Sequence, residues 1–486
     1  MTARQQPKNL WIGRWGFVLA ATGSAVGLGN IWKFPYMTGE YGGGAFVLVY
    51  LACILCIGIP AMMTEIAFGR RGRGSPIDAV KRVAQESGRG KIWSGFGWMS
   101  MLAGFMILSF YVVVAGWSLA YLWKAISGGL QGGSVDDMAA IFGANNANPL
   151  TLGAWSTLVT VVTMFIVGKG VQEGIERNMR WMMPGMVLLL LVMIVYAMFS
   201  GGFGEAVTFL FSFEVGKLSS EGLLAAMGHA FFTLSLSAGA IMAYGAYLPD
   251  NKSIARTTFT VAICDTLIAL MAGLAIFPAI FANGMDPASG PGLIFMSLPL
   301  AFQQMPLGSV LQVIFFVMLS VAALTSAVSM IEATVAWLTE RKGMSRKAAA
   351  WSSGIVLWLL STLAMLSFNL GADWTFAGKN FFDWLDYLTS RWMMPLGGLG
   401  LCLMAGFLLR DEIFRDELRL SKRQHALWLL MVRYVSPLGI VLIFIDALGV
   451  MSIDIGSQWP WFLAVLVVIA VLGEMLSPRV KRQFTG

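Results

Sequence analysis

The sequence predicts an all-α polytopic membrane protein with twelve transmembrane helices, and three observations support that prediction. Hydrophobic residues make up 57% of the 486 positions and charged residues only 12%, with a mean hydropathy of +0.73. The apolar residues fall into twelve runs that are long enough to cross a bilayer. The first and the sixth of these runs are interrupted near their midpoints by small and polar residues. A composition this apolar excludes a single soluble domain.

The distribution of basic residues tests the number of spans independently, because cytoplasmic loops are enriched in Lys and Arg. The twelve runs lie approximately at 15–38, 44–69, 92–125, 152–168, 181–200, 223–247, 255–282, 306–338, 348–370, 380–408, 426–448 and 457–477. If the loops alternate between two sides, all but five of the 33 Lys and Arg residues lie on the side of the N-terminus. Both termini are therefore predicted to be cytoplasmic.

The net charge of +7 reports this topology and does not indicate a nucleic-acid partner. The basic loops around Arg70, Arg341 and Lys422 are expected to be topological anchors that face anionic lipid. Cys53 and Cys56 have C-x-x-C spacing, but they lie mid-span among Leu and Ile without a nearby His or further Cys. The sequence therefore supports neither a zinc site nor a disulfide framework.

The first interruption is the stretch Gly23–Pro35, which reads G-S-A-V-G-L-G-N-I-W-K-F-P. Each interior Gly costs a helix about 1 kcal/mol and Pro about 3 kcal/mol. Irregular backbone is tolerated in a membrane only where it is buried in protein or lines a cavity. Gly23 and Gly27 could instead form a Gly-x-x-x-Gly packing motif, but that alternative explains neither Asn30 nor Lys33. We therefore predict a helix unwound at the midplane, with its backbone groups turned toward a ligand.

The second interruption lies in the sixth run, where Thr233, Ser235, Ser237 and Gly239 occur within seven residues. One Ser or Thr would merely bond to the preceding turn, but three hydroxyl residues and a glycine so close together indicate a break. The breaks lie five runs apart, so the second half would enter the membrane from the opposite side as an inverted repeat. Interrupted segments at matching positions of two halves indicate a transporter binding site. The predicted divisions are a cytoplasmic segment 1–14, halves 15–200 and 201–408, and a C-terminal part 409–486.

The polar groups inside the spans are hard oxygen donors, which suit alkali and alkaline-earth ions. They are the carbonyls of the unwound backbone, the Asn30 amide, the Asp265 carboxylate and the hydroxyls of Thr233, Thr325 and Ser326. Helix N-termini at the breaks offer positive dipole ends to an anion. A site with both features fits a zwitterion bound beside a cation. Glu65, a further carboxylate within a span, could serve function or could satisfy backbone amides.

Catalysis finds little support in the sequence, so the chain is predicted not to be an enzyme. There is no H-E-x-x-H, G-x-S-x-G or Walker A pattern, and the two histidines, His229 and His425, lie far apart. His229 is expected to be a hydrogen-bonded structural residue.

Four stretches of the chain resemble the neurotransmitter:sodium symporter family in its bacterial amino-acid branch, which is typified by LeuT. They are G-S-A-V-G-L-G-N-I-W-K-F-P-Y from Gly23, E-Y-G-G-G-A-F from Glu40, F-F-T-L-S-L-S from Phe231 and A-A-L-T-S from Ala322. The resemblance covers about residues 8 to 410 in order and spacing. It implies a LeuT-type 5+5 inverted repeat and a sodium-coupled symporter that imports neutral, hydrophobic L-amino acids by alternating access. The implied location is the bacterial inner membrane.

The resemblance also implies two sodium sites and a substrate site. The first sodium site would use Ala25, Asn30, Thr233 and Asp265 together with the substrate carboxylate. The second would use the carbonyls of Gly23, Val26 and Ala322 and the hydroxyls of Thr325 and Ser326. The substrate site would consist of Ala25, Leu28, Gly29, Ile107, Tyr111, Val114, Phe232, Thr233, Ser235, Ala238, Ser326 and Met330. Phe232 would act as its lid, and Tyr111 with the amides of Leu28 and Gly29 would meet the substrate carboxylate.

Two gates are implied on either side of the substrate site. The outer gate would use Lys33 and the inner gate Lys8, Trp11, Tyr247 and Glu340. Lys33 replaces the usual arginine and loses its planar fork. Thr389 stands where the outer gate's aspartate is expected, and Asp386, one turn earlier, is a substitute for it.

Two further departures bear on substrate and ions. Gly27 occupies the position where monoamine carriers of the family have an aspartate, which favours substrates that bring their own carboxylate. Asp265 replaces a common asparagine, and Ala269 falls where chloride-dependent members have serine. A fixed carboxylate could do the work of chloride, so we predict chloride-independent transport.

Two alternatives to amino-acid symport stay open. One is sodium-coupled uptake of a non-amino-acid osmolyte or amine, and the other is a non-transporting receptor or channel on the same scaffold. The expected partners are a small-molecule amino acid, sodium ions and the lipid bilayer, with no nucleic acid.

Overall fold

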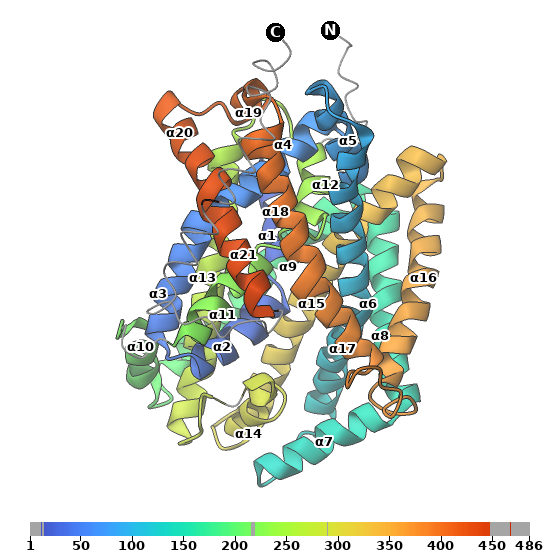
Figure 1. Ribbon diagram of the computed structural model, residues 1–486. Coiled ribbons are helices and arrows are strands. Elements are labelled where there is room, and N and C mark those ends of the chain that lie inside the picture. Colours follow the sequence, from blue (N-terminus) through green and yellow to red (C-terminus); the bar gives the residue numbers. More distant parts are fainter. Residues whose placement is uncertain (1–10, 12–13, 215–218, 289, 448–466, 468–486) are drawn as a thin grey trace.

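The computed structural model describes residues 11, 14–214, 219–288, 290–447 and 467, and this part of the chain forms a helical bundle (Figure 1). One isolated bridge, between Phe376 and Lys379, is the only β-type pairing among the described residues. The short helices α5 and α19 lie at one end of the bundle, and α7 and α14 lie at the other (Figure 1). An all-α architecture was predicted and is confirmed.

The helices follow one another along the chain with short connections. The first thirteen are α1 (Arg14–Ala25), η1 (Gly29–Lys33), α2 (Phe34–Glu40), α3 (Gly44–Cys53), η2 (Ile54–Gly58), α4 (Ile59–Gly72), α5 (Pro76–Glu86), η3 (Lys91–Ser94), α6 (Gly95–Ser127), α7 (Val135–Ala147), α8 (Pro149–Gly168), η4 (Val171–Glu176) and α9 (Arg177–Ala197). The others are α10 (Phe203–Phe211), α11 (Ser220–Thr233), α12 (Ala240–Ala246), α13 (Ile254–Ala282), η6 (Gly290–Leu293), α14 (Ser297–Gln303), α15 (Gly308–Lys342), α16 (Arg346–Leu366), α17 (Phe381–Asp386), η7 (Tyr387–Met393), α18 (Met394–Leu403), η8 (Met404–Leu408), α19 (Asp411–Leu418), α20 (Lys422–Leu430), η9 (Met431–Val435) and α21 (Ser436–Ala447).

The predicted spans can be compared with these helices one by one. Nine of them correspond to continuous helical segments that are long and apolar enough to cross a membrane, counted over the described residues. The first and sixth spans are broken, as predicted, and the twelfth, at 457–477, lies outside the described residues except for residue 467. The fifth span begins at Val171 and not near 181. Six of its first ten residues are polar or charged, so a hydropathy window does not register this part although it is helical.

The first break separates α1 from η1 at Val26–Leu28. The N–H of Gly27 donates to Oδ1 of Asn30 at 3.1 Å, so a side chain satisfies backbone that the helix has released. Pro35 lies where the π-helical segment η1 passes directly into α2. The residues that argued against a continuous helix are therefore the ones that form the break.

The second break runs from Leu234 to Gly239, between α11 and α12. Ser235 and Ser237 have φ angles of +52° and +60°, and Gly239 has +76°. The left-handed region costs a non-glycine residue about 1 kcal/mol, so the surrounding contacts hold these serines there. Glu65 of α4 provides one such contact, because its carboxylate accepts the N–H of Ser237 at 2.6 Å. Of the two roles left open for Glu65, the structure shows that it satisfies a backbone amide.

The broken helices lie beside long, continuous ones. The helices α6 and α15 pack along each other, and α1 contacts both α13 and α15. Helix α6 also approaches the second break closely, because a Cβ at Gly104 would lie 2.2 Å from the carbonyl oxygen of Ala238. The unwound backbone is therefore enclosed by protein, as its unpaired polar groups require.

The basic residues at the end of α4 were expected to face lipid, but they contact other parts of the protein instead. Arg70 is 1% exposed and forms an ion pair of 2.7 Å with Glu417 of α19. Arg73 donates to the carbonyl oxygens of Ala246 at 3.0 Å and Leu248 at 2.8 Å, just past α12. A run of basic residues in the sequence indicates only on which side of the membrane a loop lies. The groups that Arg70 and Arg73 contact come from distant parts of the chain.

Candidate functional site

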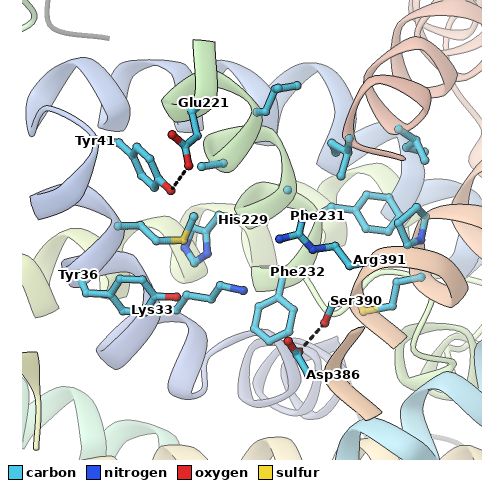
Figure 2. Close-up of a pocket in the computed structure, with 18 residues that line it drawn as sticks. Lys33, Tyr36, Tyr41, Glu221, His229, Phe231, Phe232, Asp386, Ser390 and Arg391 are labelled. Atoms are coloured by element: carbon cyan, nitrogen blue, oxygen red, sulfur yellow. Dashed lines mark hydrogen bonds between the residues drawn. The ribbon is translucent and has the colours of Figure 1, made fainter. Parts of the chain in front are cut away.

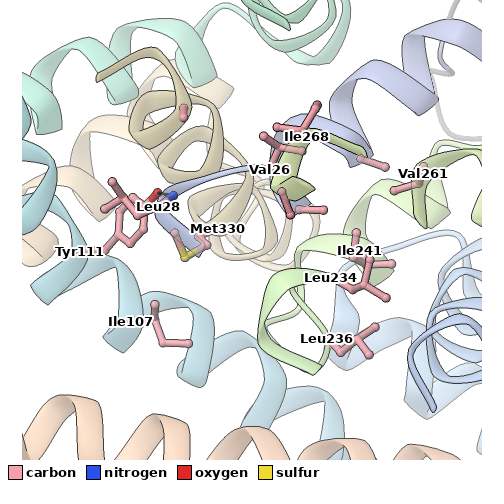
Figure 3. Close-up of a cluster of buried hydrophobic side chains, with 14 of the residues drawn as sticks. Val26, Leu28, Ile107, Tyr111, Leu234, Leu236, Ile241, Val261, Ile268 and Met330 are labelled. Carbon is pink, nitrogen blue, oxygen red and sulfur yellow. Dashed lines mark hydrogen bonds between the residues drawn. The ribbon is translucent and has the colours of Figure 1, made fainter. Parts of the chain in front are cut away.

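A small cavity of about 40 Å³ lies between the two breaks. Eleven of the twelve predicted substrate-site residues line it: Ala25, Leu28, Gly29, Ile107, Tyr111, Phe232, Thr233, Ser235, Ala238, Ser326 and Met330. Figure 3 shows Ile107 and Tyr111 of α6 with Leu28 and Met330 beside them. Val114 is buried in α6 but does not line the cavity. Ser24, Gly27 and Met394 also line it and were not among the predicted contacts.

One wall of the cavity carries the polar groups expected to meet a carboxylate. The N–H of Leu28 points at the Tyr111 hydroxyl oxygen, 3.5 Å away. Gly27 lies beside them, and a Cβ there would approach Oγ of Ser326 to 2.3 Å and the Tyr111 hydroxyl to 3.1 Å. Only glycine therefore leaves this wall open.

The predicted first sodium site is assembled around Asp265 of α13, which is fully buried. Its carboxylate accepts the Asn30 amide N–H at 2.8 Å, and the Thr233 hydroxyl lies 3.2 Å from both of its oxygens. Tyr50 of α3, which the sequence did not single out, adds its hydroxyl at 3.4 Å. The groups that bond Asp265 are neutral, so its negative charge has no basic partner among the described residues. A buried carboxylate is costly unless a cation accompanies it, so the chemistry of this cluster suits a monovalent cation.

The predicted second sodium site brings α1 and α15 together. The Ser326 hydroxyl lies 3.4 Å from the carbonyl oxygens of Gly23 and Val26. The Thr325 hydroxyl lies 3.5 Å from the carbonyl oxygen of Val26 and 2.8 Å from the carbonyl oxygen of Ala322. All five predicted ligands therefore converge, and they are neutral hard oxygens of the kind that sodium prefers.

A wider cavity of about 370 Å³ lies next to the small one, and Phe232 and Met394 line both. The ammonium of Lys33 lies 4.4 Å from the centroid of the Phe232 ring, while Asp386 accepts the hydroxyl of Ser390 at 2.9 Å. Figure 2 shows Phe232 with Lys33 on one side and the Asp386–Ser390 pair on the other. The predicted outer pair is thus not formed in this structure: Lys33 and Asp386 line the same cavity without an ion pair.

His229 borders the wider cavity and is 1% exposed. The expectation of a hydrogen-bonded histidine is wrong here, because neither ring nitrogen has a hydrogen-bond partner within the described ranges. The ring instead packs against aromatic rings, with centroid distances of 5.3 Å to Tyr50 and 6.0 Å to Phe34.

The opposite side of the small cavity is closed by an aromatic and ionic network. The Trp11 indole N–H donates to the Tyr244 carbonyl oxygen at 3.2 Å. The backbone N–H of Trp11 donates to the Tyr247 carbonyl oxygen at 3.3 Å. The Tyr247 hydroxyl donates to Glu332 at 3.0 Å, and Glu332 forms an ion pair with Arg346.

Two of the four predicted inner-gate residues, Trp11 and Tyr247, therefore meet in this network. Glu340 instead accepts the backbone N–H of Ser75 at 2.8 Å, and Lys8 lies outside the described residues. Neither Glu332 nor Arg346 was among the predicted gate residues, and the sequence carries no local signal that pairs them.

Substituting Glu332 with glutamine is expected to loosen this closed side. Glutamine keeps an acceptor for Tyr247 but loses the charge that pairs with Arg346, and a broken buried pair leaves a costly uncompensated charge. We expect uptake to fall about tenfold and a cysteine placed at Ser24 to be alkylated about tenfold faster from the side of α5 and α19. Alkylation kinetics in membrane vesicles measure the second effect.

The matched control is Glu412→Gln on the exposed face of α19, where no such change is expected. Equal alkylation rates in all three proteins would show that the Glu332–Arg346 pair does not hold this side closed.

Comparison with known proteins places the chain among sodium-coupled transporters. Residues 8–140 and 144–481 match the family model described as "Sodium:neurotransmitter symporter family". An uncharacterized sodium-dependent transporter of Bacillus subtilis (strain 168) is 37% identical over 454 residues, which cover 93% of this chain and 100% of the relative. One from Haemophilus influenzae is 33% identical over 459 residues, covering 92% of this chain and 100% of the relative.

A solved structure extends the likeness to three dimensions. The crystal structure of MhsT in complex with L-phenylalanine superposes with a TM-score of 0.83 at 40% sequence identity. The match covers 91% of this chain and 100% of that one.

Proposed function

The chain belongs to the sodium:neurotransmitter symporter family, and from that premise we propose that it imports neutral, hydrophobic L-amino acids. It is a sodium-dependent symporter and an integral membrane protein, not an enzyme. The proposal also includes the substrate class, two sodium ions and independence of chloride. It further includes cytoplasmic termini in a bacterial inner membrane.

One observation supports this proposal above the others: the hydrogen-bonded cluster around Asp265, which could hold a cation, adjoins the cavity whose wall could hold a carboxylate. Asn30, Thr233 and Asp265 are held together by hydrogen bonds, and Thr233 also lines the cavity. Leu28 and Tyr111 line it with groups that can donate to a carboxylate. A substrate carboxylate between them would complete a sodium shell, so substrate and ion would each strengthen the binding of the other.

The rest of the cavity wall favours an uncharged, apolar side chain. Ile107, Ala238 and Met330 contribute aliphatic surface, and the described lining carries no Lys, Arg, Asp or Glu. A volume of about 40 Å³ is too small for a large side chain, so Phe232 or the flexible Met330 and Met394 would have to move. MhsT, which is 40% identical, was crystallised with L-phenylalanine, which agrees with a large apolar substrate.

Alternating access would use the two groups of residues that close the small cavity on either side. Phe232 and Lys33 separate the small cavity from the wider one, and the network of Trp11, Tyr247 and Glu332 closes the other side. In the proposed division, residues 15–200 and 201–408 form the two halves that each contribute one broken helix. Ala25 would supply a backbone carbonyl to the first proposed sodium ion, and Gly23, Val26 and Ala322 would supply theirs to the second.

Uptake into proteoliposomes tests the proposal. We expect a mixture of labelled neutral amino acids to accumulate under an inward sodium gradient, with no accumulation when potassium replaces sodium and full accumulation without chloride. Separating the mixture then identifies the substrate. Sodium-dependent binding without accumulation would contradict transport and favour the receptor alternative. Accumulation of an amine or osmolyte in place of every amino acid would contradict the substrate class.

Met330→Ala is expected to shift selectivity toward larger side chains. The substitution removes a side chain that lines the cavity, and a few methylene groups in such a pocket change discrimination by about tenfold. The measurement is the ratio of uptake rates for tryptophan and leucine. Val114→Ala is the matched control, because Val114 is equally buried but lies outside the cavity lining. A larger change in the control than in Met330→Ala would contradict the assigned lining.

A further inference from the structure

The connection between α16 and α17 contains a groove of about 400 Å³ that is separate from the transport site. It lies at the end of the bundle near α7, where the chain leaves α16 (Figure 1). The groove is lined by Leu363, Ser367, Gly371, Asp373, Trp374, Thr375, Phe376, Lys379, Phe381 and Trp384.

Large apolar side chains are exposed along this groove. Phe376 is 75% exposed, Trp374 66% and Leu363 45%. Exposed aromatic side chains at the end of a membrane span are typical of the interface between the bilayer and water. The groove therefore has the composition of a lipid-contacting surface.

The groove continues the lipid-facing surface of α16. Trp351, Ile355, Leu359 and Leu363 are all exposed and recur every four residues, so they lie along one side of the helix. Helix α16 is one of the segments long and apolar enough to span the membrane, so this stripe faces acyl chains. Its last member, Leu363, is also a wall of the groove. A chain lying along the stripe would run directly into the groove.

Two opposite charges border the groove. Lys379 lies with its ammonium 5.1 Å from the centroid of the Tyr387 ring, and Asp373 is exposed. Neither residue forms an ion pair with any part of the chain that the structure describes. A cation and an anion beside an apolar groove are complementary to the phosphate and the ammonium of a zwitterionic phospholipid headgroup.

Hydrogen bonds hold the groove in shape. Phe376 and Lys379 exchange backbone hydrogen bonds of 2.9 and 3.1 Å across a tight turn. The Trp384 indole N–H donates to the carbonyl oxygen of Phe376 at 2.7 Å. The aromatic side chains are thus displayed from a fixed loop, which lowers the ordering cost of binding.

We propose that this groove binds one phospholipid of the membrane leaflet on the side of α7, with a zwitterionic headgroup that carries an ammonium, such as phosphatidylethanolamine. Its acyl chain lies along Leu363, Trp374 and Phe376. Its phosphate contacts Lys379 and its ammonium contacts Asp373. The inference depends on the membrane span α16 and not on the identity of the transported substrate.

Native mass spectrometry of the full-length, delipidated protein titrated with dioleoyl phosphatidylethanolamine tests this proposal. We expect one retained lipid, and about fivefold weaker retention in the double variant Phe376→Ala, Lys379→Ala. Phosphatidylglycerol, which lacks the ammonium, should bind about fivefold more weakly to the wild type, and Asp373→Asn should remove that preference.

The matched control is Phe199→Ala, which removes a phenylalanine that is 85% exposed at the end of α9, outside the groove. The thermal unfolding midpoint of each variant shows whether it folds. Equal lipid retention by the folded double variant and the wild type would overturn the proposal. A dimer that disappears in the double variant, without any lipid adduct in the wild type, would assign this face to a second copy of the chain and would also overturn it.

Discussion

Asp265→Asn is expected to reduce sodium-driven uptake in chloride-free buffer by about two orders of magnitude, the largest effect predicted here. Asparagine has nearly the same shape and keeps an oxygen that can accept from Asn30 and Thr233. The substitution therefore removes one negative charge while preserving the hydrogen-bonded cluster. If the carboxylate compensates the charge of a sodium ion, that compensation is lost. Initial rates of amino-acid uptake into proteoliposomes measure the effect.

Adding chloride to the Asp265→Asn protein is expected to restore part of the uptake, because a free anion can replace the missing charge. Asp136→Asn, at an exposed position in the first turn of α7, is the matched control and should transport like the wild type. Near-normal uptake by Asp265→Asn without chloride would show that the carboxylate does not carry the ion coupling.

Gly27→Ala is expected to have the second-largest effect, reducing uptake by up to about one hundredfold. The added Cβ would lie 2.3 Å from Oγ of Ser326 and 3.1 Å from the Tyr111 hydroxyl. Both neighbours belong to the proposed site, so the methyl group would displace a sodium ligand and a carboxylate donor together. Overpacking alone costs about 1–3 kcal/mol, which corresponds to a factor of up to about one hundred. Equilibrium binding of the labelled substrate separates lost binding from slowed transport.

Gly143→Ala in α7 is the matched control for this substitution, because a Cβ there meets nothing within 4 Å. Its uptake should equal that of the wild type. Unchanged substrate binding by Gly27→Ala would contradict the placement of the carboxylate beside Tyr111.

The two breaks could be predicted from the sequence because their signal is local. Glycine, asparagine and serine at the middle of an apolar span conflict with a continuous helix, and the conflict needs no knowledge of neighbouring helices. The twelve substrate-site residues followed from the resemblance to the family, and eleven of them line the cavity. Their roles stay predictions, although the structure places them around one cavity.

Val114 is the one predicted substrate-site residue that does not line the cavity. It was assigned from the resemblance to the family, together with Ile107 and Tyr111 of the same helix. Seven residues separate Val114 from Ile107, which is about 10 Å along a helix. A resemblance indicates which residues face a site, but the extent of the cavity along α6 depends on how the neighbouring helices pack.

Ion pairs between side chains of distant segments could not be predicted from the sequence. Arg346 meets Glu332 only because α16 returns beside α15, and Arg70 is buried only because α19 folds over the end of α4. Met394 reaches both cavities from the start of α18, just after the π-helical segment η7, and no local motif marks it. In each case the informative quantity is a distance between segments that are far apart in the chain.

The hydrogen bond from Ser235 to the carbonyl oxygen of Ser24, 2.8 Å long, joins the two breaks and bears on turnover. Ser235 also lines the cavity of the proposed substrate site, so a substrate that bonds to this hydroxyl competes with a bond that the protein already makes to itself. Binding then exchanges one partner for another, and the net gain of such an exchange is only about 1 kcal/mol. A transporter with such a bond would bind its substrate weakly enough to release it. The same internal hydrogen bond would form again when the site is empty.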